Sequence, residues 1–368
     1  MKTSEVIFSD NRADHRRNML QKTEQLLLTA GLEKRIARND LVAVKIHFGE
    51  MGNTGFIRPI YVRRVVELIK RLGGKPFVTD ANTLYAGTRS DSVSHLETAL
   101  ANGFGYSCVG APLIIADGLR GGSEVEVNID GSHFKKVCIA SEFVNADAVV
   151  AMTHFKGHEI TGFGGALKNL GMGAASRRGK MAQHSALSPK VTRKKCIACG
   201  DCVAHCAHSA IAIDEKAAID PAKCVGCGEC VIVCPVKAVQ IQWTEGPLAL
   251  QEKMAEHAAG ALKGKEEKSI FLNFLTQVSP ACDCAGHSDA PIVADVGMLT
   301  SADPVAIDQA SVDLVNAAQG REDSALKANH NPGQDKFRGV YPEIDWAIQL
   351  NRAQELGIGS RAYDLRRI

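Results

Sequence analysis

The sequence predicts an α/β protein built on a layered, largely parallel sheet. Apolar runs rich in β-branched residues alternate with amphipathic segments at helical spacing through the first 175 residues. The same alternation returns after residue 245. Strands that alternate with helices are typical of parallel sheets, whose ligands usually bind where the strands end. Between the two regions lies a cysteine-dense segment, which predicts a small α+β domain of its own.

The individual elements follow from periodicity and from the residues that start or stop them. Gly73–Gly74 ends the second predicted helix, and Asp303–Pro304 is typical of a helix start. Residues 176–195 are polar and basic and predict an irregular connector. Helices are predicted over 16–30, 60–72, 92–102, 248–262, 303–318 and 343–356, and strands over 41–48, 76–79, 113–116, 124–129, 136–140, 148–152 and 291–295.

Composition excludes several classes of protein. The 368 residues are 45% apolar and 23% charged, as in ordinary globular proteins. An aromatic content of 5% and a net charge of +2 argue against a nucleic-acid partner. There is no secretory leader and no apolar stretch of membrane-spanning length, so we expect a cytoplasmic protein without a membrane span. In that compartment the twelve cysteines are expected to be thiols or metal ligands.

The cysteine-dense segment contains an internal repeat. Cys196, Cys199, Cys202 and Cys206 recur 28 residues later as Cys224, Cys227, Cys230 and Cys234. The surrounding residues are also alike, KKCIACGDCVAHC in the first copy and AKCVGCGECVIVC in the second. Each copy has the spacing C-x₂-C-x₂-C-x₃-C, and a repeat of this kind predicts a pseudo-twofold fold.

This spacing is typical of two [4Fe–4S] clusters. Three cysteines wrap one cluster, and the fourth reaches across the symmetry axis to the other. Zinc, which also binds CxxC pairs, is disfavoured by the duplicated fourth cysteine. Residues 194–243 resemble bacterial two-cluster ferredoxins, which transfer single electrons at low potential. The predicted ligands are Cys196, Cys199, Cys202 and Cys234 for cluster one, and Cys224, Cys227, Cys230 and Cys206 for cluster two.

The chain divides into three parts at the borders of this segment. Residues 1–190 form the first part of the α/β unit, 191–244 the ferredoxin-like domain, and 245–368 the second part of the α/β unit. The interpretation adopted is an insertion of the small domain into one larger unit. Three consecutive domains are the alternative.

Two polar segments follow predicted strands in the first part. Lys45 and His47 alternate along a strand, and Asn53 and Arg58 lie in the glycine-containing loop after it. These residues predict a binding site for a small anionic substrate, against the alternative of a polar turn. Asp80 and Asn82 follow the next strand and are further substrate-binding candidates, although either could be only a helix cap.

A third segment, HFKGHEITGFGGALKNLGMG, combines basic side chains with a glycine-rich loop. His154, Lys156, His158 and Lys168 are candidate catalytic residues, and Asn169 is a candidate substrate ligand. A glycine-rich loop that opens into a helix favours binding of a phosphate or carboxylate. The alternative is a turn without function.

A fourth segment contains the soft ligands Cys282, Cys284 and His287. Three such ligands could hold zinc or iron with one open position. The two cysteines could instead be a redox pair. A pair of incidental thiols beside a turn is the third interpretation.

Several of these motifs together resemble a known family. They are KIHFGE, GNTGFIRP, TDANTLY, KGHEITGFGGALKNLGMG, CDC and DVGMLTSADPVAID. The chain is similar, from about Val6 to its end, to the family called domain of unknown function 362, often labelled uncharacterised Fe–S centre proteins. The resemblance implies one α/β catalytic-type unit with an inserted two-cluster ferredoxin domain. It implies no substrate.

Three functions are compatible with these features. The favoured hypothesis is an iron–sulfur-dependent oxidoreductase whose two clusters pass electrons to a small anionic substrate in the α/β unit. The alternative is a ferredoxin-like electron carrier or redox sensor whose α/β unit docks a redox partner protein. A non-redox lyase or isomerase with structural clusters has the least support, because it would not need a separate eight-cysteine domain.

Overall fold

A computed structural model describes residues 3–368 and contains an α/β unit with one large sheet. The strand order is β16-β1-β15-β14-β7-β2-β3-β4, and all strands except β15 run in the same direction. The predicted α/β fold with a largely parallel sheet is therefore confirmed. The strands are β1 (Ser4–Asp10), β2 (Leu41–Lys45), β3 (Lys75–Asp80), β4 (Leu113–Ile115), β7 (Ala148–His154), β14 (Ser269–Leu275), β15 (Gly297–Ser301) and β16 (Tyr363–Arg367).

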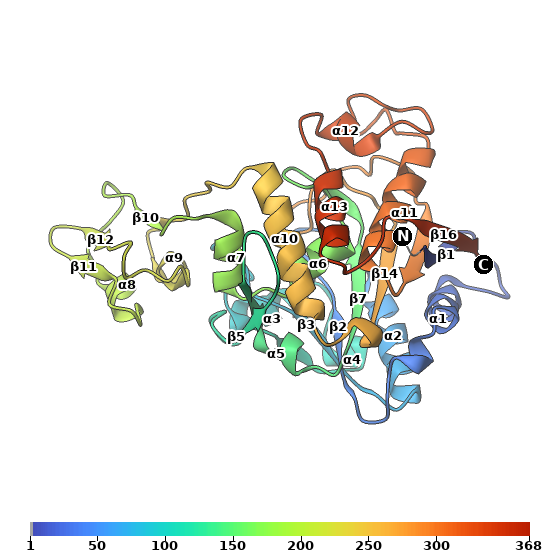
Figure 1. Ribbon diagram of the computed structural model, residues 1–368, viewed down its shortest axis with the longest axis horizontal. Helices are drawn as coiled ribbons and strands as arrows, with labels where there is room; N and C mark the ends of the chain where they lie inside the picture. The colour runs from blue at the N-terminus through green and yellow to red at the C-terminus, as the bar shows by residue number, and fades with distance from the viewer. Residues whose placement is uncertain (1–2) are drawn as a thin grey trace.

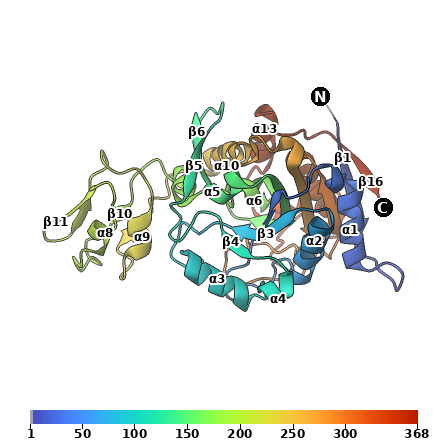
Figure 2. The same cartoon turned by 90° about the horizontal axis from the view of Figure 1, so that it is seen from below.

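Helices cover both faces of this sheet (Figures 1 and 2). Successive strand residues point to opposite faces, so Val42 and Val44 pack with one helix layer and Ala43 with the other. The first layer contains α1 (Met19–Thr29), α2 (Pro59–Arg71), α3 (Ser92–Ala101) and α4 (Tyr106–Val109). The second contains α6 (Ala166–Gly171), α10 (Pro247–Leu262), α11 (Pro304–Ala317) and α13 (Ala347–Glu355). The result is a three-layer arrangement.

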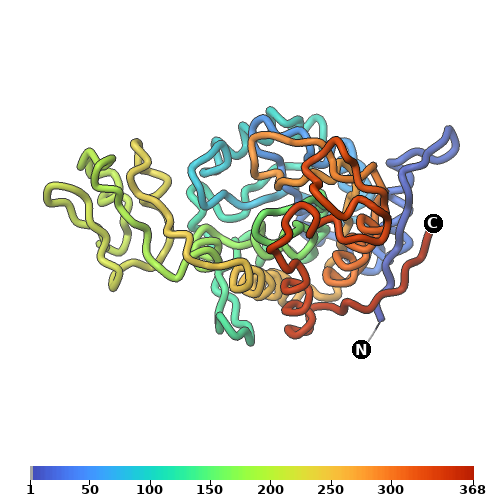
Figure 3. The backbone as a smooth tube through the Cα atoms, turned by 90° about the horizontal axis from the view of Figure 1, so that it is seen from above, coloured from blue at the N-terminus to red at the C-terminus, as the bar shows by residue number. Residues whose placement is uncertain are grey.

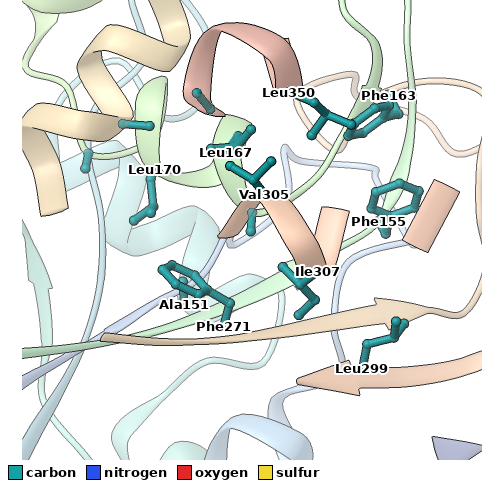
Figure 4. Packing of buried hydrophobic residues seen from close by; sticks show 14 of the residues in the cluster. Ala151, Phe155, Phe163, Leu167, Leu170, Phe271, Leu299, Val305, Ile307 and Leu350 are labelled. Carbon is teal, nitrogen blue, oxygen red and sulfur yellow. The ribbon is translucent and has the colours of Figure 1, made fainter. Parts of the chain in front are cut away.

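The second layer is anchored by a dense apolar core (Figure 4). Leu167 and Leu170 of α6 pack with Val305 of α11 above Ala151 and Phe271 of the sheet, and all five side chains are at most 1% exposed. Complete burial of a side chain such as Leu or Phe stabilises a fold by roughly 1.5–3 kcal/mol. This packing fixes α6, a short helix, above the centre of the sheet.

A buried carboxylate also holds the start of α6. Asp308 accepts hydrogen bonds from Ala166 N at 2.7 Å, Leu167 N at 2.9 Å and Asn273 Nδ2 at 2.9 Å. The charge lies at a helix N-terminus, where the backbone dipoles favour an anion. Burial nevertheless raises the pKa of Asp308 to about 6, although the three donors oppose this shift. The α11 helix thus positions α6 through one side chain.

The cysteine module, which we define as residues 190–240, projects from one side of the α/β unit (Figures 1 and 3). Its antiparallel strand pairs are β10 with β13 and β11 with β12. The chain enters and leaves side by side, since Glu245 N donates to His184 O at 3.3 Å. The module contains β10 (Lys190–Val191), α8 (Asp201–Ala204), β11 (Ile211–Ile213), β12 (Ala217–Ile219), α9 (Glu229–Val233) and β13 (Val239–Gln240).

In the sequence, the module lies between two strands that are neighbours in the large sheet. It follows β7 and precedes β14, and these strands pair in parallel. Strands from residues 1–190 and from 245–368 therefore share one sheet.

Smaller elements complete the unit: α5 (Ser141–Asn145), α7 (Arg177–His184), α12 (Lys336–Val340), the 3₁₀ turns Leu32–Lys34 and Glu266–Lys268, and the hairpins β5 (Glu124–Asn128) with β6 (Lys136–Ala140) and β8 (Lys156–His158) with β9 (Gly162–Gly164).

Two sequence-based expectations are wrong. Residues 291–295 form no strand; Val293 makes an isolated bridge to Gly320, and the backbone of Ile292 bonds to the loop residues Val278 and Arg321 instead of to a strand of the sheet. The expected irregular connector contains the helix α7, capped by Ser176. Its apolar periodicity is weak because Arg177 and Lys180 lie on its buried side. Within the described chain, no helix has the length and apolar character needed to cross a membrane.

Replacing Asp308 with Ala should destabilise the protein by roughly 3 kcal/mol, because three buried donors lose their acceptor. Urea unfolding at pH 7 measures the change. Asp313→Asn on the same helix is the control, since that carboxylate is exposed. An equal effect of the two substitutions would contradict the role assigned to Asp308.

Candidate functional site

A cavity of about 330 Å³ lies at the edge of the sheet where the parallel strands end, and we call it the edge cavity. Lys45 is the last residue of β2 and Asp80 the last of β3, so adjacent parallel strands deliver both side chains to the same place. Lys156 and His158 come from β8, directly after β7. Helices α6 and α7 and the loop after β14 close the remaining sides.

Asp80 is the anion that holds the first group of cations. Its Oδ1 lies 3.0 Å from Lys45 Nζ, and its Oδ2 lies 3.6 Å from Arg89 Nη1. Lys45 Nζ also donates to Asn169 Oδ1 at 2.7 Å. Burial opposes the negative charge, but Lys45, Arg89 and other basic neighbours outweigh it and hold the pKa of Asp80 well below its usual range. Asp80 is therefore ionised at neutral pH.

Asp283 holds a second group, behind the wall of the cavity. His154 Nδ1 lies 2.8 Å from Asp283 Oδ1, and Lys156 Nζ lies 3.1 Å from Oδ2. The other ring nitrogen of His154 contacts the carbonyl oxygens of Thr276 at 3.0 Å and Gln277 at 3.1 Å. Carbonyls only accept, so His154 Nε2 carries a proton. With both nitrogens engaged, His154 is a positioning residue for the loop that contains Asp283.

The thiols on either side of Asp283 face the edge cavity. Cys282 is 2% exposed, and its Sγ lies 3.5 Å from Lys168 Nζ. A hydrogen bond from Cys284 lowers the pKa of Cys282 well below the usual thiol value, and Lys168 and Lys156 act in the same direction against burial. The same hydrogen bond and burial raise the pKa of Cys284. The pair thus favours a thiolate at Cys282 and a thiol at Cys284.

Two histidines at the cavity are held neutral. Burial lowers the pKa of His158 and of His47 well below the usual histidine value. His158 Nδ1 accepts from Ile160 N at 3.2 Å and Thr161 N at 3.3 Å, and His47 Nδ1 accepts from Gly49 N at 3.0 Å. In each ring the proton is therefore on Nε2. Both side chains can donate a hydrogen bond but are weak acids at neutral pH.

Two lysines give the cavity an excess of positive charge. Lys168 and Lys180 form no ion pair with a carboxylate among the described residues. Lys180 is 5% exposed, and burial lowers its pKa to about 8. The lining also includes the apolar side chains of Leu84, Trp243 and Leu250. The cavity is therefore suited to a small anion with an apolar part.

The cysteine module contains two further small cavities, each with four cysteines in its wall. Both sets take three cysteines from one repeat and the fourth from the other repeat. One cavity is lined by Cys196, Cys199, Cys202 and Cys234, and the other by Cys224, Cys227, Cys230 and Cys206. These are the sets expected from the sequence.

The two repeats also direct backbone groups to sulfur in the same way. Ala210 N donates to Cys206 Sγ at 3.3 Å, and Ala238 N, 28 residues later, donates to Cys234 Sγ at 3.1 Å. Backbone N–H groups aimed at sulfur stabilise thiolate ligands of a metal cluster. The donor set and its surroundings therefore fit two four-iron clusters.

The second four-cysteine cavity lies against the α/β unit. Cys230 belongs to a buried apolar cluster that also contains Leu84 and Met181. The loop at Gly228 is so close that an added Cβ would lie 3.4 Å from Leu84. Leu84 also lines the edge cavity. One leucine side chain is therefore shared by the edge cavity and the wall of the module.

The structure brings together nine residues proposed from the sequence. They line the edge cavity and are Lys45, His47, Asp80, Lys156, His158, Lys168, Asn169, Cys282 and Cys284.

The remaining candidates lie elsewhere. Asn53 and Asn82 bind backbone atoms of neighbouring loops. Arg58 lines a separate cavity beside β14. The side chain of His287 is exposed, and residues 3–368 contain no group of three His, Cys, Asp or Glu side chains that could hold a single metal ion.

Sequence reasoning missed four important residues. Asp283 is not among the predicted site residues, although a carboxylate between two candidate cysteines was the available signal. Lys180 and His184 lay in the supposed connector, and their spacing of four residues was the available signal for a helix face. Trp243 follows the module, and no pattern in the sequence connects it with the edge cavity.

Replacing Lys180 with Met should stabilise the protein at pH 7 by up to roughly 3 kcal/mol, because a buried charge is removed. The folded-state pKa is depressed, so wild-type stability rises with pH between about 8 and 10.5 and the advantage of the variant disappears there. Unfolding at pH 7 and pH 10 tests this, with exposed Lys135→Met as control. A variant less stable than wild type at pH 7 would refute it.

Two solved structures resemble this chain only weakly, and a family model matches it. The chain spans about half the length of two solved proteins that it matches. One is the lactate racemase apoprotein from Thermoanaerobacterium thermosaccharolyticum, with 13% identity, a TM-score of 0.37, and coverage of 74% of this chain and 51% of that chain. The other is a protein from Thermotoga maritima, with 10% identity, a TM-score of 0.37, and coverage of 92% and 58%. No curated protein matches.

The family assignment rests on a match to a family model. The model of the family described as Domain of unknown function (DUF362) matches residues 42–313. That span is well over half of the 368 residues and includes the edge cavity and the cysteine module. The chain belongs to the DUF362 family.

Proposed function

We propose that this chain is an iron–sulfur oxidoreductase that transfers electrons to a small anionic substrate in the edge cavity. The observation that carries the proposal is the pair of four-cysteine cavities with exchanged fourth ligands. The exchange is the arrangement of two-cluster ferredoxins, so the module is proposed to be an inserted ferredoxin-like domain. When bound, such clusters supply single electrons at low potential.

The second cavity of the module is the proposed point of electron exit. Gly228 in its wall is so close to Leu84 that an added Cβ would lie 3.4 Å away, and Leu84 lines the edge cavity. An ion pair also joins the module to the α/β unit beside this cavity, since Arg120 Nη1 lies 3.6 Å from Glu229 Oε1. A short path through packed side chains favours transfer from this cavity over transfer from the more distant one.

The edge cavity supplies charge and a proton. Lys168 and Lys180 have no carboxylate partner among residues 3–368 and attract the anionic part of the substrate. Lys180, with a pKa of about 8, is the best-matched proton donor near neutral pH. The histidines proposed for this role from the sequence are less suitable, because His158 is neutral and His154 has both nitrogens engaged. The apolar side chains of Leu84 and Leu250, which are at most 3% exposed, limit the access of water to the substrate.

A redox partner protein is the proposed electron source, in a reducing compartment such as the cytoplasm. The first cavity of the module is bordered by Ile197, Ile213 and Val236, which are 60%, 36% and 36% exposed. Exposed apolar side chains next to a cluster suit a docking protein. The same surface would serve a second candidate function, an electron carrier or redox sensor without its own substrate.

Anaerobically purified protein should contain about eight iron and about eight sulfide per chain, because each [4Fe–4S] cluster holds four of each. Cys206→Ser and Cys234→Ser should each impair one cluster, as followed by iron content and EPR. About four iron per chain in the wild type would contradict the two-cluster proposal, and stoichiometric zinc without iron would refute it outright.

Dithionite-reduced protein should be reoxidised by some member of a panel of small oxidised carboxylates, phosphates and disulfides. The rate should fall as pH rises above about 8, because Lys180 loses its proton. Lys180→Met should abolish this pH dependence and slow the reaction on the order of 100-fold. Exposed Lys135→Met is the control. Reoxidation only by a partner protein, unchanged in Lys180→Met, would favour the carrier instead.

A further inference from the structure

The segment Cys282–Asp283–Cys284 is fixed more firmly than an ordinary loop. Each of its three carbonyl oxygens accepts a hydrogen bond: Cys282 O from Ala285 N at 2.9 Å, Asp283 O from Glu50 N at 2.9 Å, and Cys284 O from Tyr85 OH at 3.2 Å. Lys156 and His154 bind the Asp283 side chain on the opposite side. This clamp turns the two thiols together toward the edge cavity.

These are the two cysteines of the chain that line the edge cavity. The other ten are eight in the cysteine module and Cys108 and Cys138, none of which borders it. Lys168 Nζ, 3.5 Å from Cys282 Sγ, is the nearest cation and has no carboxylate partner in the described part of the chain. A buried lysine that faces a thiol favours the thiolate form, and the thiolate is the nucleophile in thiol chemistry.

We propose that Cys282 and Cys284 form a redox-active dithiol that reduces a small anionic disulfide bound beside Lys168 and Lys180. This inference rests on the proposed function for the source of electrons, and it gives that site its substrate class. Cys282 is the attacking thiolate and Cys284 the resolving thiol.

Reduction of the substrate proceeds through two thiol–disulfide exchanges, followed by reduction of the protein disulfide. The Cys282 thiolate attacks one sulfur of the substrate, an S–S bond forms to Cys282, and the first half of the substrate leaves as a thiolate. Cys284 gives its proton to the departing sulfur as it attacks Cys282 Sγ; the bond between Cys282 and the second half of the substrate breaks, the Cys282–Cys284 disulfide forms, and the second half leaves as a thiol. Two electrons from the module and one proton then restore the Cys282 thiolate and the Cys284 thiol.

A dithiol at this position also links one-electron donors to a two-electron reaction. Iron–sulfur clusters deliver electrons singly, whereas cleavage of a disulfide takes two. A disulfide between residues only two apart closes a short ring and is expected to be strained, and strained disulfides are the readily reduced ones. The pair can therefore store two electrons next to the substrate.

The test uses the anaerobic full-length protein and 5,5′-dithiobis(2-nitrobenzoate), an anionic disulfide with a coloured leaving thiolate. The background variant is Cys108→Ser, which removes an exposed cysteine. We expect fast release of two thiolates per chain and a Cys282–Cys284 disulfide by peptide mass spectrometry. In Cys284→Ser, one thiolate should leave and a stable adduct should remain on Cys282. Cys282→Ser should slow release on the order of tenfold or more.

Lys168→Met should slow the first step without changing the final count of thiolates, and exposed Lys135→Met should do neither. Two independent adducts on Cys282 and Cys284 without a disulfide would overturn the inference. So would a rate at Cys282 no higher than that of Cys108 in the wild type. Iron analysis of the same sample separates the two proposals, because disulfide formation in iron-free protein would sustain the dithiol and refute the clusters.

Discussion

Two buried carboxylates, Asp80 and Asp283, make the edge cavity possible. Buried cations repel one another and lose their hydration, so a cluster of lysine and arginine side chains is stable only around fixed anions. Asp80 holds Lys45 and Arg89, and Asp283 holds Lys156 together with the His154 ring. Both carboxylates depend on the sheet: Asp80 ends β3, and Asp283 is bound by residues at and just after the end of β7. Lys168 and Lys180 remain without carboxylate partners in this arrangement, and their charge is available to a ligand or a thiolate.

The position of the cysteine module follows from the same sheet. After β7 the chain leaves the sheet to form the module. It returns through α10, which packs on the same face as α6, and then forms β14, the neighbour of β7 in the sheet. The module is thereby held next to α7, whose Met181 faces the module and whose Lys180 faces the edge cavity. A single helix of eight residues therefore connects the proposed electron source with the proposed substrate site. The position of α7 between the module and the edge cavity accounts for the burial of its polar side chains.

The sequence was most informative where one local pattern decides the structure. The alternation of strands and helices predicted the fold, and the cysteine spacing predicted both four-cysteine sets. It was least informative where contacts between distant segments decide. No local pattern distinguishes Asn53, which binds the carbonyls of Ala285 and His287, from Asn169, which binds Lys45 inside the cavity. The helix α7 was missed because its buried side carries Arg177 and Lys180, so that the usual apolar stripe is absent. The apolar run at 291–295 has the pattern of a strand, but its backbone bonds to residues of distant loops instead of to the sheet.

The central claim is that two four-iron clusters are bound by exchanged cysteine sets and that the second lies beside the edge cavity. Anomalous diffraction at the iron absorption edge, from crystals grown without oxygen, tests it most directly. The account predicts two iron peaks of equal weight in the module, the second enclosed by Cys206, Cys224, Cys227 and Cys230 and facing Leu84. A single peak, or ligation of each cluster by the four cysteines of one repeat, would contradict it.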